Sequence, residues 1–217
     1  MNRKAVVAGA TGLVGKELVK LLLNNPEYTA VMLIVRRPTG IAHPKLQEKI
    51  VDFNRLEQSD VNLTGADVFC TLGTTIKKAG SQKAFRLVDY EYPLALGRMA
   101  KAQGAKQFLL ITSMGANPAS RTFYIRVKGE VEKELRELGL SALHIFRPSL
   151  LLGNREEFRF GERISAVFSS ILSPLFLGTL KKYKPVHAET VAGAMLRIAQ
   201  KGTSGIHVYE SNQIVQA

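Results

Sequence analysis

Gly9-Ala10-Thr11-Gly12-Leu13-Val14-Gly15 is the stretch that decides the fold of this sequence of 217 residues. It follows the short apolar run 6–8 and leads directly into an amphipathic pattern over 13–24, so we expect a strand, a tight turn and a helix. Gly9 permits the turn, Gly12 lets the backbone approach a pyrophosphate, and Gly15 permits close packing of the helix. Because the first N–H groups of a helix attract phosphates, the stretch predicts a dinucleotide-binding loop. The predicted contacts are Gly9, Thr11, Gly12, Leu13, Val14 and Gly15.

The rest of the chain alternates short apolar runs with longer helical patterns. Strands are expected at 6–8, 31–35, 49–53, 67–71, 108–112 and 143–146, and helices at 13–24, 81–104, 122–138 and 188–200. Strands that alternate with crossover helices imply a parallel sheet. The predicted fold class is therefore α/β, a doubly wound Rossmann sheet in a single domain over 1–217. Residues 149–187 and 201–217 are expected to form a small substrate-covering region, with a last short strand at 206–209.

The residues that follow the other strands indicate which cofactor is bound. An NAD site typically has an acidic residue after the second strand, which accepts a hydrogen bond from the ribose 2′-OH. Here Val35 is followed by Arg36 and Arg37, which can bind a 2′-phosphate through two hydrogen bonds. We therefore expect NADP(H). Asp52, after the third strand, can accept a hydrogen bond from the adenine amino group. The small residues after the fourth strand let backbone pass close to the cofactor ribose, and they include Leu72, Gly73 and Thr74.

A candidate catalytic set lies farther along the chain. Tyr124 and Lys128 are four residues apart on a predicted helix and therefore share one face. A nearby cation favours the phenolate form of a tyrosine, which makes it usable as an acid or base. Lys128 can also reach the nicotinamide ribose. Ser113 ends the fifth strand, at the sheet edge where ligands bind, so its hydroxyl can polarise a carbonyl.

Together these segments resemble the short-chain dehydrogenase/reductase superfamily, in its atypical branch, and within it the Tat-interacting-protein family of NADPH-binding proteins. The segments that carry the resemblance are 9–15, 35–37, 71–75, 110–115, 123–132, 146–148 and 150–152. The resemblance implies that Ser113, Tyr124 and Lys128 are the catalytic residues, and that Pro148, Ser149 and Leu150 line the nicotinamide end.

One departure from this family pattern keeps a second function open. Established enzymes of the superfamily carry an Asn in the long helix before the fifth strand, whereas this chain has Leu87-Val88-Asp89-Tyr90. The first hypothesis is an NADPH-dependent oxidoreductase that acts on a carbonyl or hydroxyl group. The alternative is an NADP(H)-binding regulatory or interaction protein with little or no turnover.

Composition bears on the other possible partners and sites of this chain. The net charge of +12 attracts anions, but no aromatic stacking platform accompanies the basic run 181–184, so a nucleic-acid partner is not expected. Cys70 is the only cysteine and the four histidines are scattered, so no metal site is expected. The uncharged segment 164–180 is interrupted by Pro174, which favours a lid over an apolar small-molecule substrate and leaves peripheral membrane contact open. The N-terminus lacks a secretory pattern, so a cytoplasmic location is expected.

Overall fold

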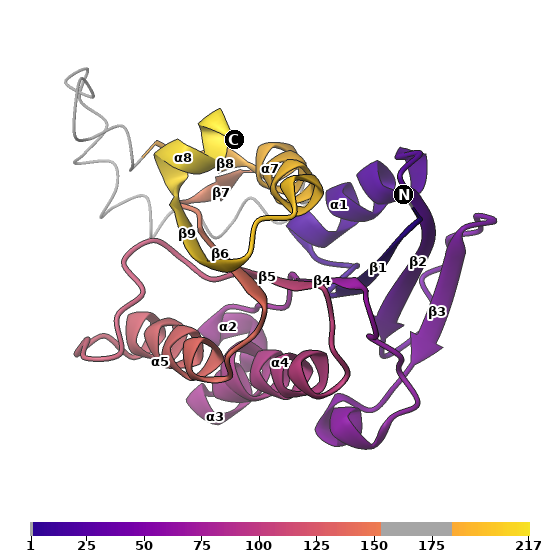
Figure 1. The fold of residues 1–217 in the computed structure, drawn as a ribbon. Coiled ribbons are helices and arrows are strands. Elements are labelled where there is room, and N and C mark those ends of the chain that lie inside the picture. Colours follow the sequence, from indigo (N-terminus) through magenta and orange to yellow (C-terminus); the bar gives the residue numbers. More distant parts are fainter. Residues whose placement is uncertain (1, 153–183) are drawn as a thin grey trace.

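The structure is a computed structural model that describes residues 2–152 and 184–217. Within these residues, seven strands form one parallel sheet in the order β3-β2-β1-β4-β5-β6-β9 (Figure 1). The strands are β1 (Arg3–Ala8), β2 (Tyr28–Val35), β3 (Leu46–Ile50), β4 (Asp67–Cys70), β5 (Gln107–Ile111), β6 (Ala142–Arg147) and β9 (Gly205–Glu210). The order reverses between β1 and β4, and open α/β sheets bind ligands beyond the carboxyl ends of the strands at such a point. The predicted doubly wound Rossmann sheet is confirmed.

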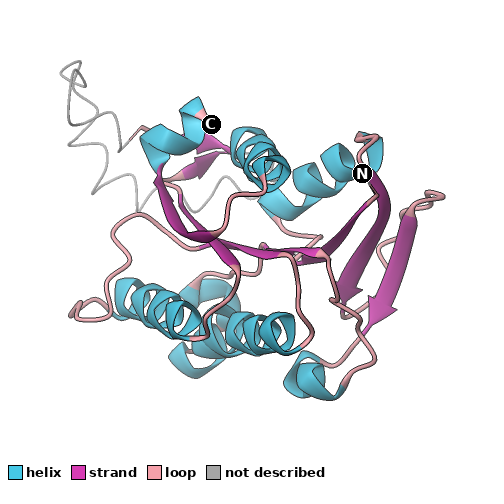
Figure 2. Cartoon of the chain, in the orientation of Figure 1, coloured by secondary structure: helices cyan, strands magenta, loops and turns pink. Residues whose placement is uncertain are grey.

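Helices cover both faces of the sheet (Figures 1 and 2). One face carries α1 (Leu13–Asn24), α7 (Ala188–Lys201) and α8 (Ser211–Gln216). The other carries α2 (Ile76–Ala79), α3 (Gln82–Arg86), α4 (Tyr92–Ala102) and α5 (Phe123–Glu137). All five residues of β5 are buried because helices cover it on both sides, which explains its continuous apolar sequence. Each face therefore has its own apolar core, one against α1 and α7 and one against α4 and α5.

The helix expected over 81–104 is divided by a π-helical turn, η2 (Leu87–Glu91). The Tyr92 N–H binds the carbonyl of Leu87, five residues earlier. Pro93 follows at once, and a proline can neither donate to the carbonyl four residues before it nor accommodate that carbonyl sterically. Apolar periodicity predicts the helix, but it does not show that Pro93 widens one turn of it. The widened turn directs Asp89 to the interior, where the residue is 2% exposed.

Two further expectations about segment boundaries need correction. The third strand was expected at 49–53 but spans Leu46–Ile50, because Phe53 already belongs to the helical turn η1 (Phe53–Gln58), which Asp52 caps. Residues 205–210 were expected in the covering region, but β9 extends the main sheet by pairing with β6, and α8 packs against β9 and α7.

Part of the expected covering region lies outside the described residues, including the apolar segment 164–180. The described residues on the two sides of 153–183 are paired, because β7 (Leu151–Leu152) pairs with β8 (Val186–His187). In the part of the chain that the structure describes, no helix combines the length and apolar character that a membrane crossing requires.

A buried polar cluster joins the strands at the amino edge of the sheet. Asp67, which is 1% exposed, accepts hydrogen bonds from Arg3 Nε (2.9 Å), Tyr28 Oη (2.7 Å) and Gln107 Nε2 (2.6 Å). Gln107 Nε2 also donates to the carbonyl of Ala199 near the end of α7. The cluster satisfies its buried charges internally and lies at the edge opposite the ligand crevice, so its role is structural.

Candidate functional site

The glycine loop joins β1 to α1 and packs against the end of β4. Gly9 has φ +92°, and a Cβ there would lie 2.6 Å from the carbonyl carbon of Thr71. A side chain at Gly15 would collide with Thr71 Oγ1 at 2.8 Å and with the Gly9 carbonyl. Since real Cβ atoms do not approach backbone so closely, both positions require glycine for the packing itself.

The N-terminus of α1 is open to an anion. Gly12 is its N-cap, and within the described residues no side chain caps it. The Gly12 N–H is used within the loop, where it donates to the Gly9 carbonyl at 2.9 Å. The N–H groups of Leu13 and Val14 come next, in the first turn, where a helix offers unpaired donors and the positive end of its dipole. Thr11 is exposed beside them. This arrangement matches a pyrophosphate.

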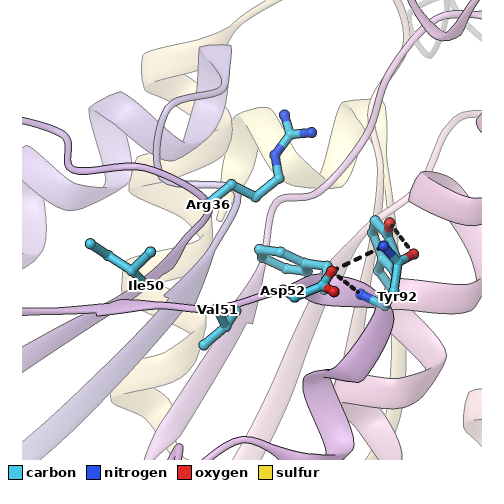
Figure 3. Close-up of a pocket in the computed structure, with 7 residues that line it drawn as sticks. Arg36, Ile50, Val51, Asp52 and Tyr92 are labelled. Atoms are coloured by element: carbon cyan, nitrogen blue, oxygen red, sulfur yellow. Dashed lines mark hydrogen bonds between the residues drawn. The ribbon is translucent and has the colours of Figure 1, made fainter.

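A cavity of about 460 Å³ lies beyond the ends of β2 and β3 (Figure 3). It is lined by Arg36, Ile50, Val51, Asp52, Phe53, Asn54 and Tyr92. Figure 3 shows Arg36 on one side of the cavity and Asp52 and Tyr92 on the other. The predicted pair of arginines is thus divided: both are exposed, but Arg36 lines the cavity and Arg37 lies outside its lining.

Sequence reasoning found Asp52 in this cavity but missed its aromatic wall. Asp52 Oδ1 accepts from the backbone N–H and from Nδ2 of Asn54, both at 3.0 Å. Tyr92 Oη donates to Asn54 Oδ1 at 3.0 Å, and the ring of Tyr92 lies 5.3 Å from that of Phe53. Flat apolar rings beside polar groups suit a nucleobase. Tyr92 comes from the start of α4, so no local pattern near Asp52 could have indicated it.

The candidate catalytic residues lie on the segments that follow β5, in the loop after it and on α5. Ser113 follows β5, and its Oγ is buried without a hydrogen-bond partner in the described part of the chain. The loop that carries it is held to the loop after β6, since Met114 N–H donates to the Pro148 carbonyl at 2.9 Å. Tyr124 is half-buried in the first turn of α5, with its ring 5.4 Å from that of Phe85. A buried hydroxyl without a partner indicates a group that a ligand completes.

Lys128 lies one turn after Tyr124 and is 5% exposed. Its Nζ forms an ion pair with Asp89 Oδ1 at 2.7 Å. Asp89 Oδ2 accepts the backbone N–H of Thr74 at 2.9 Å, in the loop after β4. A Cβ built on Gly73 would lie 3.8 Å from Lys128 Nζ. The loop Leu72, Gly73 and Thr74, predicted to approach the cofactor, therefore lies against the predicted catalytic lysine.

The electrostatics of this group depend on Asp89. Burial, the largest single effect, would lower the pKa of Lys128, but Asp89 together with Tyr124 and Cys70 raises that pKa above its ordinary value. Cys70, at the end of β4, has its pKa raised by burial to about 12, so its thiol stays uncharged at neutral pH. Asp89 was seen in the sequence only as a position that lacks Asn. Its contact with Lys128 was missed because the two residues belong to different elements.

The segment after β6 is held by the C-terminal helix. Pro148 is buried, and Leu150 is 37% exposed. Ser149 Oγ donates to the Lys184 carbonyl at 2.5 Å and accepts from Ser211 Oγ at 2.9 Å. The hydroxyl of Ser149 is therefore already bonded within the protein. That Pro148, Ser149 and Leu150 line the nicotinamide end stays a prediction.

Comparison with known proteins agrees with this geometry. A family model described as NAD(P)H-binding matches residues 9–169. The HTATIP2 protein of Rattus norvegicus is 36% identical over 219 residues, which cover 99% of this chain and 88% of the rat protein. The chain belongs to the Tat-interacting-protein family of NAD(P)H-binding proteins. The family resemblance drawn from the glycine loop and from Tyr124 and Lys128 is thus confirmed.

Another family relative corrects one expectation. The FMP52 protein of Candida albicans is 33% identical and covers 92% of this chain and 89% of its own length. It is named mitochondrial, as is the FMP52 protein of Coccidioides immitis. These names contradict the cytoplasmic location expected from the sequence. The N-terminal pattern excluded a secretory signal only, and it does not distinguish the cytoplasm from an organelle.

Solved structures support the fold of the family. MoeE5 in complex with UDP-glucose and NAD has a TM-score of 0.70 at 17% identity, over 98% of this chain and 80% of that chain. The human epimerase family protein SDR39U1 with NADPH has a TM-score of 0.64 at 19% identity, over 95% and 72%. These likenesses concern the Rossmann fold, and they include both an NAD complex and an NADPH complex.

Proposed function

We propose that this chain is an NADPH-dependent oxidoreductase that transfers hydride to or from a carbonyl or hydroxyl group of a small-molecule substrate. The observation that carries the proposal is the meeting of two sets of residues. The buried Lys128, one turn from Tyr124, lies against Gly73 in the loop assigned to the cofactor ribose. The shared position of these residues at one edge of the sheet supports the proposal that they act on one bound cofactor.

The cofactor is assigned by the groups along that edge. The first-turn N–H groups of α1 would hold the pyrophosphate, and the cavity beside Asp52 and Tyr92 would hold the adenine. Arg36, on the wall of this cavity, would bind a 2′-phosphate, which distinguishes NADPH from NADH. Arg37 contributes less, because it lies outside the lining.

The chemistry follows from three side chains. NADPH, when bound, supplies the hydride. Ser113 donates a hydrogen bond to the substrate carbonyl oxygen, which accounts for its buried hydroxyl without a partner. Tyr124 gives that oxygen a proton in reduction and takes it back in oxidation. Lys128 places a positive charge beside Tyr124 and holds the ribose hydroxyls. The uncharged sequence 164–180 favours an apolar substrate.

The alternative, an NADP(H)-binding regulator without turnover, rested on the absent Asn and on the apolar segment 164–180. Asp89 provides a polar partner for Lys128 from the same helical stretch, which weakens the first of these reasons.

The test is turnover of NADPH with a panel of apolar carbonyl compounds. Tyr124→Phe should lower kcat by about 100-fold or more, because it removes the proton donor while keeping the ring. Tyr90→Phe is the matched control, since Tyr90 lies on η2 under the guanidinium of Arg86 and outside the proposed site. An unchanged rate in Tyr124→Phe would refute the mechanism, and NADPH binding without turnover on any substrate would favour the regulator.

A further inference from the structure

Asp89 is a buried carboxylate whose two oxygens serve two different donors. Oδ1 lies 2.7 Å from the ammonium of Lys128, and Oδ2 accepts the Thr74 N–H at 2.9 Å. The side chain of Asp89 has no exposed surface, and that of Lys128 is 6% exposed. Such a charge pair is costly to bury and requires good geometry on both partners.

An asparagine could not replace this carboxylate in the same geometry. An amide offers one acceptor oxygen and one donor nitrogen, whereas Lys128 and the Thr74 backbone are both donors. Asparagine would therefore leave one of these two buried donors facing an NH₂ group. The direct contact with Lys128 thus accounts for Asp89 in the helical stretch where established enzymes of the superfamily carry Asn.

Lys128 interacts with polar side chains from three elements. Asp89 comes from η2, Cys70 from β4, and Tyr124 from α5 itself, and all three raise the pKa of Lys128 against the effect of burial. Asp89 is the carboxylate among them and makes the ion pair. Without the charge of Asp89, the two largest effects that oppose burial would be reduced, and burial would favour the neutral amine of Lys128.

We propose that Asp89 is a positioning residue: through one carboxylate it fixes Lys128 as a protonated ammonium beside Tyr124 and ties it to the Gly73–Thr74 loop. This inference rests on the proposed function for what Lys128 does, but not for how Lys128 is held. Asp89 touches neither substrate nor reacting atoms in this scheme. It acts through Lys128 and through the loop that approaches the ribose.

The direct test is an NMR titration of the Lys128 side chain in the whole protein, with isotope-labelled lysine. In the wild type, Lys128 should stay protonated at a pH where the exposed lysines have half titrated. In Asp89→Asn, its midpoint should fall by at least about one pH unit, because a buried ammonium has lost its counter-charge. Glu91→Gln is the matched control: it removes an exposed carboxylate from the same turn, 3.7 Å from Arg86, and should leave the Lys128 midpoint unchanged.

A wild-type Lys128 that titrates before the exposed lysines, or an unchanged midpoint in Asp89→Asn, would overturn the proposal. The wild-type measurement decides even if Asp89→Asn does not fold. Neither measurement needs turnover, so a failure of the proposed function is distinguishable from a failure of this inference. Where turnover is found, the basic limb of kcat/KM for carbonyl reduction should move to lower pH in Asp89→Asn and stay in place in Glu91→Gln.

Discussion

Arg147 donates two hydrogen bonds to the carboxylate of Glu132, from Nε to Oε1 at 3.0 Å and from Nη2 to Oε2 at 2.5 Å. Glu132 Oε1 also accepts from Thr112 Oγ1 at 2.6 Å, directly before Ser113. Arg147 Nη1 continues the network to Glu210, which caps α8. The buried carboxylate of Glu132 and the partly buried Arg147 thus connect the loop that carries Ser113 to α5, β6 and the C-terminal helix.

Glu132→Gln should lower the free energy of unfolding by about 3 kcal/mol, because it leaves the charge of Arg147 partly uncompensated in a buried network. Urea unfolding measures the loss. Lys133→Gln, next to Glu132 on α5, is the control, since its pair with Glu137 is 3.8 Å long and 61% and 60% exposed. Lys133→Gln should lower the free energy of unfolding by less than about 0.5 kcal/mol. Equal losses in both variants would mean that the buried network contributes no special stability.

Gly12 and Gly15 of the loop should respond differently to alanine. Gly15→Ala should destabilise the fold by about 2 kcal/mol, because its Cβ would collide with the Gly9 carbonyl and Thr71. A Cβ at Gly12 would lie 3.1 Å from the Gly9 carbonyl oxygen and 3.8 Å from that of Thr71, so Gly12→Ala should change stability much less. Its methyl group should instead obstruct the phosphate and weaken NADPH binding by about tenfold.

Gly193→Ala is a matched control for these changes. Gly193 lies inside α7, and a Cβ there would meet only the flexible end of Arg197. Alanine should stabilise that helix by up to about 1 kcal/mol and leave NADPH binding unchanged. Thermal unfolding and NADPH titration of the variants test both statements. A Gly15→Ala protein as stable as the wild type would show that the loop tolerates a side chain.

Local patterns were sufficient for the parts of this fold that depend on neighbours in sequence. The glycine loop was predictable because Gly9, Gly12 and Gly15 act within one turn and one helix start. Ser113, Tyr124 and Lys128 were proposed as a catalytic set from their order and spacing, and that role stays a prediction. The central strands β4, β5 and β6 were found within a few residues, because largely apolar runs mark strands that are buried on both faces.

The features that the sequence did not predict depend on contacts between distant segments. Asp89 and Lys128 are buried against each other because the fold packs the π-helical turn η2 against α5, far along the chain. Arg36 and Arg37 are adjacent and chemically identical, so only the tertiary structure separates the one that lines the cavity from the one that does not.

That separation gives a prediction on cofactor choice. Arg36→Ala should raise the Kd for NADPH by about 10- to 100-fold, because a charge-assisted hydrogen bond to the 2′-phosphate is lost. The Kd for NADH should change little. Arg37→Ala is the matched control and should have a smaller effect on NADPH. Equal affinity of the wild type for NADPH and NADH, measured by fluorescence titration, would refute the assignment of Arg36 to the phosphate.

His144 predicts how stability depends on pH. Its ring is fully buried in β6 and stacked 5.2 Å from that of His207, and Nδ1 lies 3.2 Å from Tyr209 Oη. Burial, with a smaller contribution from His207, lowers the pKa of His144 to about 4. Since an unfolded histidine titrates near pH ~6.5, the unfolded state binds the extra proton between these values. Stability due to neutral His144 is therefore complete above pH ~6.5 and is lost as the pH falls toward 4.

The free energy of unfolding should accordingly drop by about 2 kcal/mol between pH ~7 and ~4.5 from this residue alone. His144→Phe, which keeps an aromatic ring in the stack, should remove that part of the decline. His43→Phe is the control, because His43 lies in the loop before β3, where it accepts the Lys45 N–H, and its replacement should leave the decline in place. Urea unfolding of the three proteins at both pH values gives the comparison. If His144→Phe and the wild type lose the same stability on acidification, the buried imidazole is not the group that takes up the proton.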